Sequence, residues 1–499
     1  MNVTWHGWRK WALWVCLLST AGCRGPLGEG LLLPARWQGL EDTAGLTLVA
    51  RIVHVSDTHV VDEESPARFA GAQVITRSAW RPWEAYATQI FDGIVRATNR
   101  IHAWDRPIDF VVHTGDACDN VQSNELAWFL TVWDGGAIDP LTGPDDRPID
   151  ERPAVGLDPH AMFDAQGLYQ AGVHGDAPSI PWYVVFGNHD VYGIGVFPIL
   201  STLFGERVAP LPLDLRPGIL LPTVLDPTGA WAHGNVTPAY PGPPPLLELA
   251  GYVTPSADRA YYERRTFIRA MFETVTGPAG HGFADPESGP SWYSTSPVEG
   301  VRLIGLNTCD QPNIIAGLFY QEAGISAEQV AFLRAELDAA RERGEWVIVA
   351  SHHPSPSLSR LYGSVLDGEQ FRAILGEYPN VILHLAGHEH RNHVMDRGSY
   401  LEIETCATID LPQEARVIEI RQDDVDGSIV IAYEMFSHLD DALPSLGDDP
   451  LHDLRAEGRA IAEADRRSVD REKSYPAAGA DPGEARGTPF DRQGAIVLP

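Results

Sequence analysis

The sequence has few cysteines and far fewer basic than acidic residues. Five cysteines in 499 residues are too few for a disulfide framework, and none has the spacing of a zinc-thiolate site. Lysine and arginine number 37 against 68 aspartates and glutamates, which gives a formal charge of −31. This charge repels nucleic-acid backbones and anionic membrane faces, so it argues against DNA as a partner. Bound divalent cations could reverse the field inside a site.

Long apolar runs are also missing after the first 22 residues, so no later segment predicts a transmembrane helix. At the N-terminus, Arg9 and Lys10 precede a short apolar stretch that ends in small residues before Cys23, as in an export signal. The segment "STAGC" resembles a bacterial lipoprotein processing site, although Thr20 replaces the usual leucine. We expect an exported lipoprotein of a bacterial cell envelope, lipidated at Cys23 and so in contact with the membrane. A cleaved signal, giving a periplasmic or secreted protein, and an uncleaved anchor are the alternatives.

Composition divides the rest of the chain into regions. We expect a signal peptide at 1–22, a tether at 23–48, a main domain at 49–440 and an acidic polar tail, partly disordered, at 441–499. Two loop-rich insertions, at about 134–178 and 191–300, interrupt the main domain. We expect both insertions to form a cap over the site.

Short apolar segments rich in β-branched residues recur through the main domain and predict strands. They are residues 50–56, 108–113, 181–186, 301–306, 346–351 and 380–385. A helix is well marked between Ser326 and Gly344, because Ser326 and Gln329 stand at capping-box positions and Gly344 ends the apolar pattern. Strand, helix and strand in succession indicate an α/β layered fold.

Polar side chains follow five of these strands at the point where each strand ends. The motifs are "SDTH" with Asp57 and His59, "TGDACD" with Asp116 and Asp119, "GNHD" with Asn188 and His189, "SHHP" with His352 and His353, and "AGHEH" with His388 and His390. Each motif alone has a structural explanation, such as a turn or a packed histidine. Because open α/β sheets bind ligands at the carboxyl ends of their strands, the five motifs together predict one metal site.

The mixture of donors restricts the metal. Carboxylate and amide oxygens together with imidazoles suit Zn, Mn or Fe, whereas Ca prefers oxygen alone. Seven such residues are too many for one ion, but two ions about 3.5–4 Å apart that share a carboxylate would use them all. The sequence therefore predicts two divalent or mixed-valence transition metal ions. The predicted ligands are Asp57, His59, Asp116, Asn188, His352, His388 and His390.

The ordered motifs D-x-H, G-D-x-x-D, G-N-H-D, an isolated H and G-H-x-H resemble those of the calcineurin-like metallophosphoesterase superfamily, over residues 49–405. The resemblance implies a four-layer αββα sandwich of two mixed β-sheets flanked by helices. It also implies that Asp116 bridges the two ions. Asp57, His59 and His390 would hold one ion, and Asn188, His352 and His388 the other. His352 is preferred to His353 because similar members place the ligand two residues before the proline.

The resemblance further implies hydrolysis of a phosphomonoester or phosphodiester by attack of a metal-bridging hydroxide. His189 matches the residue that protonates the leaving oxygen, a role that suits the near-neutral pKa of an ordinary imidazole, and Asp119 matches the carboxylate that orients it. Asn120 and Asp190 depart from the protein-phosphatase branch, which argues against a phosphoprotein substrate. We expect a small-molecule or lipid-derived phosphoester and no nucleic acid. The alternatives are a non-catalytic metal-binding scaffold of the same fold and a DNA nuclease.

Overall fold

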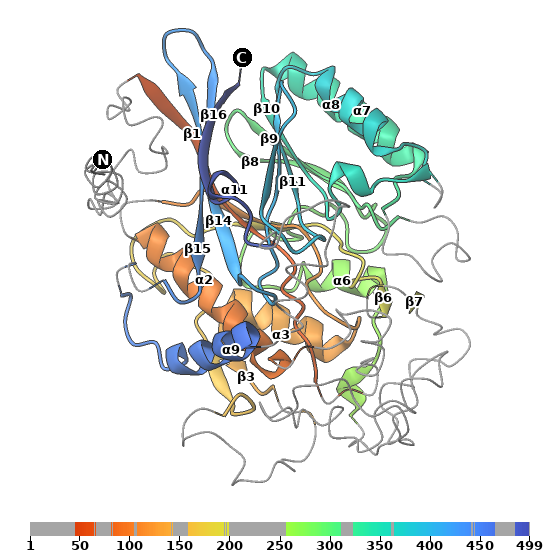
Figure 1. Cartoon of the computed structure of the whole chain (residues 1–499). Helices are drawn as coiled ribbons and strands as arrows, with labels where there is room; N and C mark the ends of the chain where they lie inside the picture. Colours follow the sequence, from red (N-terminus) through yellow and green to blue (C-terminus); the bar gives the residue numbers. More distant parts are fainter. Residues whose placement is uncertain are drawn as a thin grey trace, which may run out of the picture.

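Two six-stranded mixed sheets form the centre of the computed structural model, and helices lie outside them (Figure 1). The described residues are 45–63, 65, 81, 83–103, 107–140, 142, 158–193, 195, 197–198, 256–310, 323–360, 364–440, 443, 445–464 and 485–498. The expected signal peptide, Cys23 and most of the expected tether lie outside these residues, as does the central part of the second insertion, 199–255. No helix in the described ranges is long and apolar enough to cross a membrane.

The first sheet has the strand order β16-β15-β14-β1-β2-β5. Its strands are β1 (Leu46–Val55), β2 (Phe110–His113), β5 (Trp182–Val184), β14 (Glu414–Asp423), β15 (Ile429–Ser437) and β16 (Gln493–Leu498). Strands β1, β2 and β5 run parallel to one another, while β14, β15 and β16 pair antiparallel. The carboxyl ends of the three parallel strands therefore meet at one edge of the sheet.

The second sheet has the order β12-β13-β11-β10-β9-β8. Its strands are β8 (Tyr293–Val298), β9 (Val301–Gly305), β10 (Trp346–Ala350), β11 (Val381–Ala386), β12 (His393–Asp396) and β13 (Leu401–Glu404). Strands β9, β10, β11 and β13 are parallel, and β8 and β12 are antiparallel edge strands. All six strands predicted from the sequence are present in the two sheets, close to their expected bounds.

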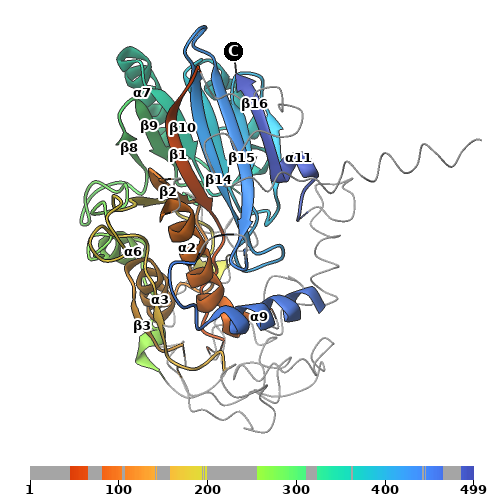
Figure 2. The same ribbon diagram turned by 90° about the vertical axis from the view of Figure 1, so that its left-hand side faces the viewer.

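Helices cover the outer faces of both sheets (Figures 1 and 2). The longer ones are α2 (Ala87–Ala103), α3 (Ser123–Asp134), α7 (Ala327–Arg343), α8 (Gly368–Gly376) and α9 (His452–Ala464); α6 (Arg264–Ala270) and α11 (Pro489–Arg492) are short. Helices α2, α3 and α9 lie on the side of the first sheet, and α7 and α8 along the second (Figure 1). The predicted four-layer αββα sandwich is confirmed.

The alternation of side chains along β10 shows how the layers are held together. Val347 and Val349 pack in the cluster that also contains Leu333 and Leu337 of α7. Ile348 and Ala350 belong to the larger cluster, which also contains residues of the first sheet such as Ile52 and Val417. Successive residues of a strand point to opposite faces, so this fully apolar strand serves two cores.

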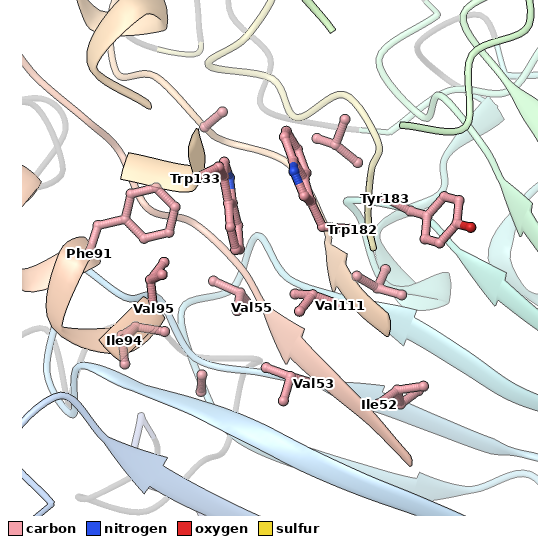
Figure 3. Close-up of a cluster of buried hydrophobic side chains, with 14 of the residues drawn as sticks. Ile52, Val53, Val55, Phe91, Ile94, Val95, Val111, Trp133, Trp182 and Tyr183 are labelled. Carbon is pink, nitrogen blue, oxygen red and sulfur yellow. The ribbon is translucent and has the colours of Figure 1, made fainter. Parts of the chain in front are cut away.

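Aromatic rings fill the core beneath α2 and α3 (Figure 3). Trp133 stacks on Trp182 with ring centroids 4.9 Å apart, and Phe91 meets Trp133 edge-on at 5.1 Å. Val53, Val55 and neighbouring strand residues complete the cluster. This core fixes β1, β2 and β5 relative to the helices, and the loops that follow those strands carry the candidate site.

Two of the expected regions contain strands of the main sheets. Residues 293–298 fall inside the expected second insertion but form β8, because "YSTSPV" gains backbone hydrogen bonds by pairing with β9. The expected polar tail contains α9 and β16, and β16 covers the edge of β15 in antiparallel register. Gly494, Ala495 and Leu498 are buried there, so residues 493–498 belong to the sheet. The smaller ribbons β3 (Gly136–Ile138) with β4 (Phe163–Ala165), and β6 (Tyr192–Gly193) with β7 (Phe197–Pro198), lie in the insertions.

A buried carboxylate anchors the segment that follows β10. Glu402 of β13 accepts hydrogen bonds from the Ser355 amide (2.6 Å), the Ser355 hydroxyl (2.7 Å) and Arg397 Nε (2.9 Å). Burial alone would raise the pKa of Glu402. His384, Arg397 and Ser355 outweigh burial and lower the pKa from its ordinary 4.5 to about 2.

The lowered pKa predicts an acid-sensitive contribution to stability. The contribution is fully present above pH 4.5 and is lost as the pH falls towards 2, because the folded state then binds the proton less readily than the unfolded state. Glu402→Gln should lower the free energy of unfolding at pH 7 by about 3 kcal/mol and flatten its pH dependence between 4.5 and 2. Urea unfolding at a series of pH values measures this effect. The control is Glu377→Gln, which removes one partner of an exposed ion pair. It should change the free energy of unfolding and its pH dependence only slightly. An unchanged acid slope in Glu402→Gln would contradict the assignment.

Candidate metal centre

Five strand ends bring the predicted ligands together where the two sheets meet. Asp57 and His59 follow β1, Asp116 follows β2, and Asn188 follows β5. His352 follows β10, and His388 and His390 follow β11 of the second sheet. Direct contacts cross from one sheet to the other: the His388 amide donates to Asp57 Oδ2 (3.1 Å), and His59 Nε2 lies 3.2 Å from His390 Nε2.

The backbone of these loops is unusually strained. Five of the eight non-glycine residues with positive φ in the described ranges are predicted ligands: Asp57 (51°), His59 (42°), Asp116 (54°), His388 (70°) and His390 (52°). Each left-handed residue costs about 1–2 kcal/mol, and such residues concentrate at functional sites. Backbone hydrogen bonds from the Asp57 amide to Gly115 O (3.1 Å) and from the His59 amide to Asp116 O (2.9 Å) hold the first two loops in place.

Glycines in two motifs allow the loops to approach closely. A Cβ at Gly187 would lie 2.1 Å from Asp116 Oδ1, and a Cβ at Gly387 would lie 1.8 Å from Ser56 Oγ and 2.3 Å from Asp57 Oδ2. No real Cβ can make such contacts, so only glycine fits before Asn188 and before His388.

Four residues, which we call the first group, bring their donor atoms together: Asp57, His59, Asp116 and His390. Asp57 Oδ1 lies 3.3 Å from His390 Nε2 and 3.9 Å from His59 Nε2, and Asp116 Oδ2 lies 3.4 Å from His59 Nε2. All four residues are buried, and their ligand atoms lie within 4.8 Å of one another. These are the three residues that the family resemblance implies for one ion, together with the implied bridging residue Asp116.

The second group consists of Asn188, His352 and His388, with Asp116 shared. His352 Nε2 lies 2.9 Å from Asn188 Oδ1 and 3.3 Å from Asp116 Oδ2. His388 Nδ1 lies 3.1 Å from Asn188 Oδ1 and 3.3 Å from His352 Nε2. Asp116 Oδ2 thus stands between one histidine of each group. The second predicted set is also brought together.

The outer nitrogens of three histidines show which way their lone pairs point. His352 Nδ1 lies 2.7 Å from the carbonyl oxygen of Thr114, which can only accept, so this Nδ1 must carry the proton. His59 Nδ1 bonds Asp119 Oδ1 (2.8 Å), and His390 Nδ1 bonds Asp410 Oδ2 (2.7 Å) in the same way. A neutral imidazole protonated at Nδ1 turns the bare Nε2 lone pair inward, as metal-bound histidines do.

The electrostatics of the site favour a positive charge at its centre. Burial lowers the pKa of His352, but the carboxylates of Asp116 and Asp57 outweigh burial and raise it to about 9. Burial raises the pKa of Asp57, but His390 outweighs it and holds this pKa at about 2. The raised pKa of His352 means that its Nε2 also carries a proton, which a bound cation would replace. Inward-facing histidine nitrogens, ionised carboxylates and an amide oxygen around two overlapping positions form a donor set that fits two transition metal ions.

His189 and Asp119 lie beside the first group. His189 Nδ1 donates to the backbone oxygen of Asp119 (2.9 Å) and lies 3.4 Å from its Oδ1. The His189 amide donates to Asp116 Oδ1 (2.8 Å), which ties this residue to the shared carboxylate. The His59 and His189 rings meet edge-on with centroids 4.4 Å apart. The predicted pair is therefore adjacent to the candidate metal positions.

His353, the alternative to His352, also has a ligand atom within 4.8 Å of those of His352 and His388, but it has different partners. Its Nδ1 bonds Thr308 Oγ1 (2.8 Å), and its ring lies 4.2 Å from that of His388. His352 is the one of the two whose Nε2 meets Asp116 and Asn188.

Sequence reasoning missed the residues that support these ligands. Asp190 accepts hydrogen bonds from the amides of Gly187 (2.8 Å), Asp116 (2.9 Å) and Ala117 (2.9 Å), and so shapes the turn that presents Asp116. Its place in "GNHD" was a usable signal. Asp410 lies in no motif. Thr114 is the first residue of "TGDACD", but it acts through its backbone carbonyl, a role that its side chain does not reveal.

The sequence model of the calcineurin-like phosphoesterase family matches residues 50–229 and 290–392, more than half of the chain. The chain belongs to this family. It is a metal-dependent hydrolase of phosphoric esters, and the matched residues include all seven predicted metal ligands. No curated protein sequence matches this calcineurin-like phosphoesterase.

Several solved structures are similar at low identity. A dimetal phosphatase from Danio rerio is 12% identical with a TM-score of 0.39, over 78% of this chain and 99% of the other. A putative 5'-nucleotidase from Staphylococcus aureus is 13% identical with a TM-score of 0.34, over 82% and 58%. GAP50 of Plasmodium, described as the anchor in the inner membrane complex, is 11% identical with a TM-score of 0.30, over 80% and 97%. The family assignment rests on the sequence model alone.

Proposed function

We propose that this phosphoesterase hydrolyses a small or lipid-derived phosphomonoester or phosphodiester at a two-metal centre. The observation that carries the proposal is the position of Asp116 Oδ2, 3.4 Å from His59 Nε2 and 3.3 Å from His352 Nε2. One carboxylate oxygen faces a histidine of each group, as a residue shared by two ions must. Asp57, His59 and His390 would hold one ion, and Asn188, His352 and His388 the other, as manganese, zinc or iron.

The residues of the chain divide the chemistry among them. Bound ions acidify water and offset the charge that builds on phosphoryl oxygens during in-line displacement. Asn188 Nδ2 donates to the Gly195 carbonyl (3.1 Å), which turns its Oδ1 towards His352 and His388, and Asp116 fixes the spacing of the two groups. His189, with its Nδ1 proton held by Asp119, is the group placed to give a proton to the leaving oxygen from Nε2.

We further propose that the enzyme works outside the cytoplasm, attached to a bacterial membrane through lipid on Cys23. The N-terminal pattern of Arg9, Lys10, an apolar stretch and "STAGC" supports this location. A lipid-derived substrate would be consistent with a membrane anchor. The strongly negative charge argues against DNA as substrate. Fatty-acid labelling of wild-type protein and of Cys23→Ser tests the anchor.

Removal of metal should abolish activity. The chelated protein should not hydrolyse bis-p-nitrophenyl phosphate or p-nitrophenyl phosphate, and Mn²⁺ should restore hydrolysis as two ions bind per chain. The ratio of the two rates separates diesterase from monoesterase. Cleavage of plasmid DNA at a comparable rate would favour the nuclease alternative, and fewer than two ions per chain without activity would favour a non-catalytic scaffold. Full activity of the metal-free protein would contradict the proposal.

A further inference from the structure

A fully buried arginine lies behind the first group of ligands. Arg81 precedes the short helix η4 (Glu84–Tyr86), and its side chain is inaccessible to solvent. Its Nε and Nη2 donate to the two carboxylate oxygens of Asp410, at 2.8 and 3.1 Å. Its Nη1 lies 3.5 Å from Asp119 Oδ1 and has no hydrogen-bond partner within the described part of the chain. The guanidinium therefore stands between Asp410 and Asp119, and its Nη1 also lies 3.9 Å from the buried carboxylate of Glu84.

Each of these carboxylates holds a histidine of the first group. Asp410 Oδ2 bonds His390 Nδ1 at 2.7 Å, and Asp119 Oδ1 bonds His59 Nδ1 at 2.8 Å. The Nε2 atoms of the two histidines lie only 3.2 Å apart, so both rings converge on one position. Arg81 thus contacts two candidate ligands of the same ion indirectly, His390 through Asp410 and His59 through Asp119.

The geometry of a guanidinium suits this junction. Its planar fork fixes the angle of a carboxylate that it binds through two N–H groups, which a single ammonium cannot do. Two carboxylates buried without a cation between them would repel each other and shift the rings that they hold. Partners behind metal-bound histidines commonly set ring orientation and change metal affinity by about 10- to 100-fold.

We propose that Arg81 is a positioning residue for the ion held by Asp57, His59, Asp116 and His390. This inference rests on the proposed function, and it adds that one cation sets the orientation of two ligands through Asp410 and Asp119. The other ion position has a different support, because His352 Nδ1 bonds the Thr114 backbone. The effect of Arg81 should therefore be confined to one of the two ions.

Manganese binding to variants with a single remaining position tests this selectivity. His388→Ala disables the second group, and His390→Ala disables the first. In the His388→Ala background, Arg81→Met should weaken Mn²⁺ binding by about 10-fold or more, measured by titration of the chelated protein. In the His390→Ala background the same change should have an effect below about threefold. Arg81→Lys should recover only part of the loss, since it keeps the charge but not the fork.

Arg259→Met is the matched control. Arg259 is equally buried and donates to the Asp62 carboxylate at 2.8 Å, and other donors to this carboxylate are Asn124 and Thr142, which are not among the candidate ligands. Its loss should lower stability, as followed by thermal unfolding, with Mn²⁺ affinity changed by less than about threefold. Equal weakening in both backgrounds, weakening in neither, or the same weakening in Arg259→Met would overturn the role of Arg81. A wild-type protein that binds no Mn²⁺ would instead overturn the proposed function.

Discussion

Asp116→Asn should reduce hydrolysis of bis-p-nitrophenyl phosphate by about 10⁴-fold, because members of a catalytic unit fail together when one is removed. The Asp116 carboxylate faces His59 and His352 at once, so its charge attracts both ions. In the wild-type protein, Asp116 Oδ1 accepts a hydrogen bond from the His189 amide at 2.8 Å. Asparagine has the same shape, and its Oδ1 can accept the same hydrogen bond. The substitution therefore removes the negative charge shared by the two groups but preserves the turn that presents residue 116.

Counting ions distinguishes a shared ligand from an ordinary one. Elemental analysis after equilibration with Mn²⁺ should find both ions weakened in Asp116→Asn, whereas His390→Ala and His388→Ala should each lose one. Asp92→Asn is the control, because Asp92 is a buried carboxylate that pairs with Arg96 on α2, outside the site. Its folded protein should retain activity. If Asp116→Asn lost only one ion, or kept most of its activity, the shared role would be wrong.

The meeting of the candidate ligands at one place could be predicted because their positions in the chain obey a general rule. Each lies just after a short apolar segment, and parallel strands bring their carboxyl ends to one edge. The same reasoning predicted the helix between Ser326 and Gly344. The Ser326 hydroxyl accepts a hydrogen bond from the Gln329 amide at its start, and Gly344 ends it in a left-handed conformation. Local pattern and spacing were sufficient for these features.

Features that depend on tertiary partners could not be predicted in this way. Strand β14 carries charged residues such as Arg416 and Glu419, which look exposed in the sequence but are buried. Arg416 donates to Thr405 Oγ1 (3.1 Å) and to the backbone oxygen of Asp491 (2.6 Å), near the C-terminus. That contact also explains why the end of the chain belongs to the fold, although its composition indicated a tail.

The support of the site was equally invisible in the sequence. Asp410 lies 20 residues from His390, and Arg81 lies 38 residues before Asp119, with no motif that links them. The positive φ values of the ligands also arise from contacts between loops, such as that of the Asp57 amide with Gly115. A sequence shows which side chains can bind a metal, whereas the structure shows what holds them in strained and charged positions.

His189→Ala should slow hydrolysis by an amount that depends on the leaving group. His189 donates its Nδ1 proton to the Asp119 carbonyl, so its protonated form carries the second proton on Nε2 and can release it to a departing oxygen. A dialkyl phosphodiester releases a basic alkoxide, and its turnover number should fall by about 10³-fold. The p-nitrophenolate anion leaves without a proton, so bis-p-nitrophenyl phosphate should slow less than about tenfold.

The leaving-group comparison separates proton donation from metal binding. A variant that had lost an ion would slow on both substrates alike, whereas a lost proton donor slows mainly the alkyl ester. Ion content should stay at two per chain in His189→Ala. His160→Ala is the control, since His160 is a buried histidine that pairs with Glu63 at 2.9 Å outside the ligand groups. It should change neither rate by more than about threefold. Equal slowing of both esters by His189→Ala would assign this histidine to charge or ligand positioning, because a proton donor acts only where the leaving group needs one.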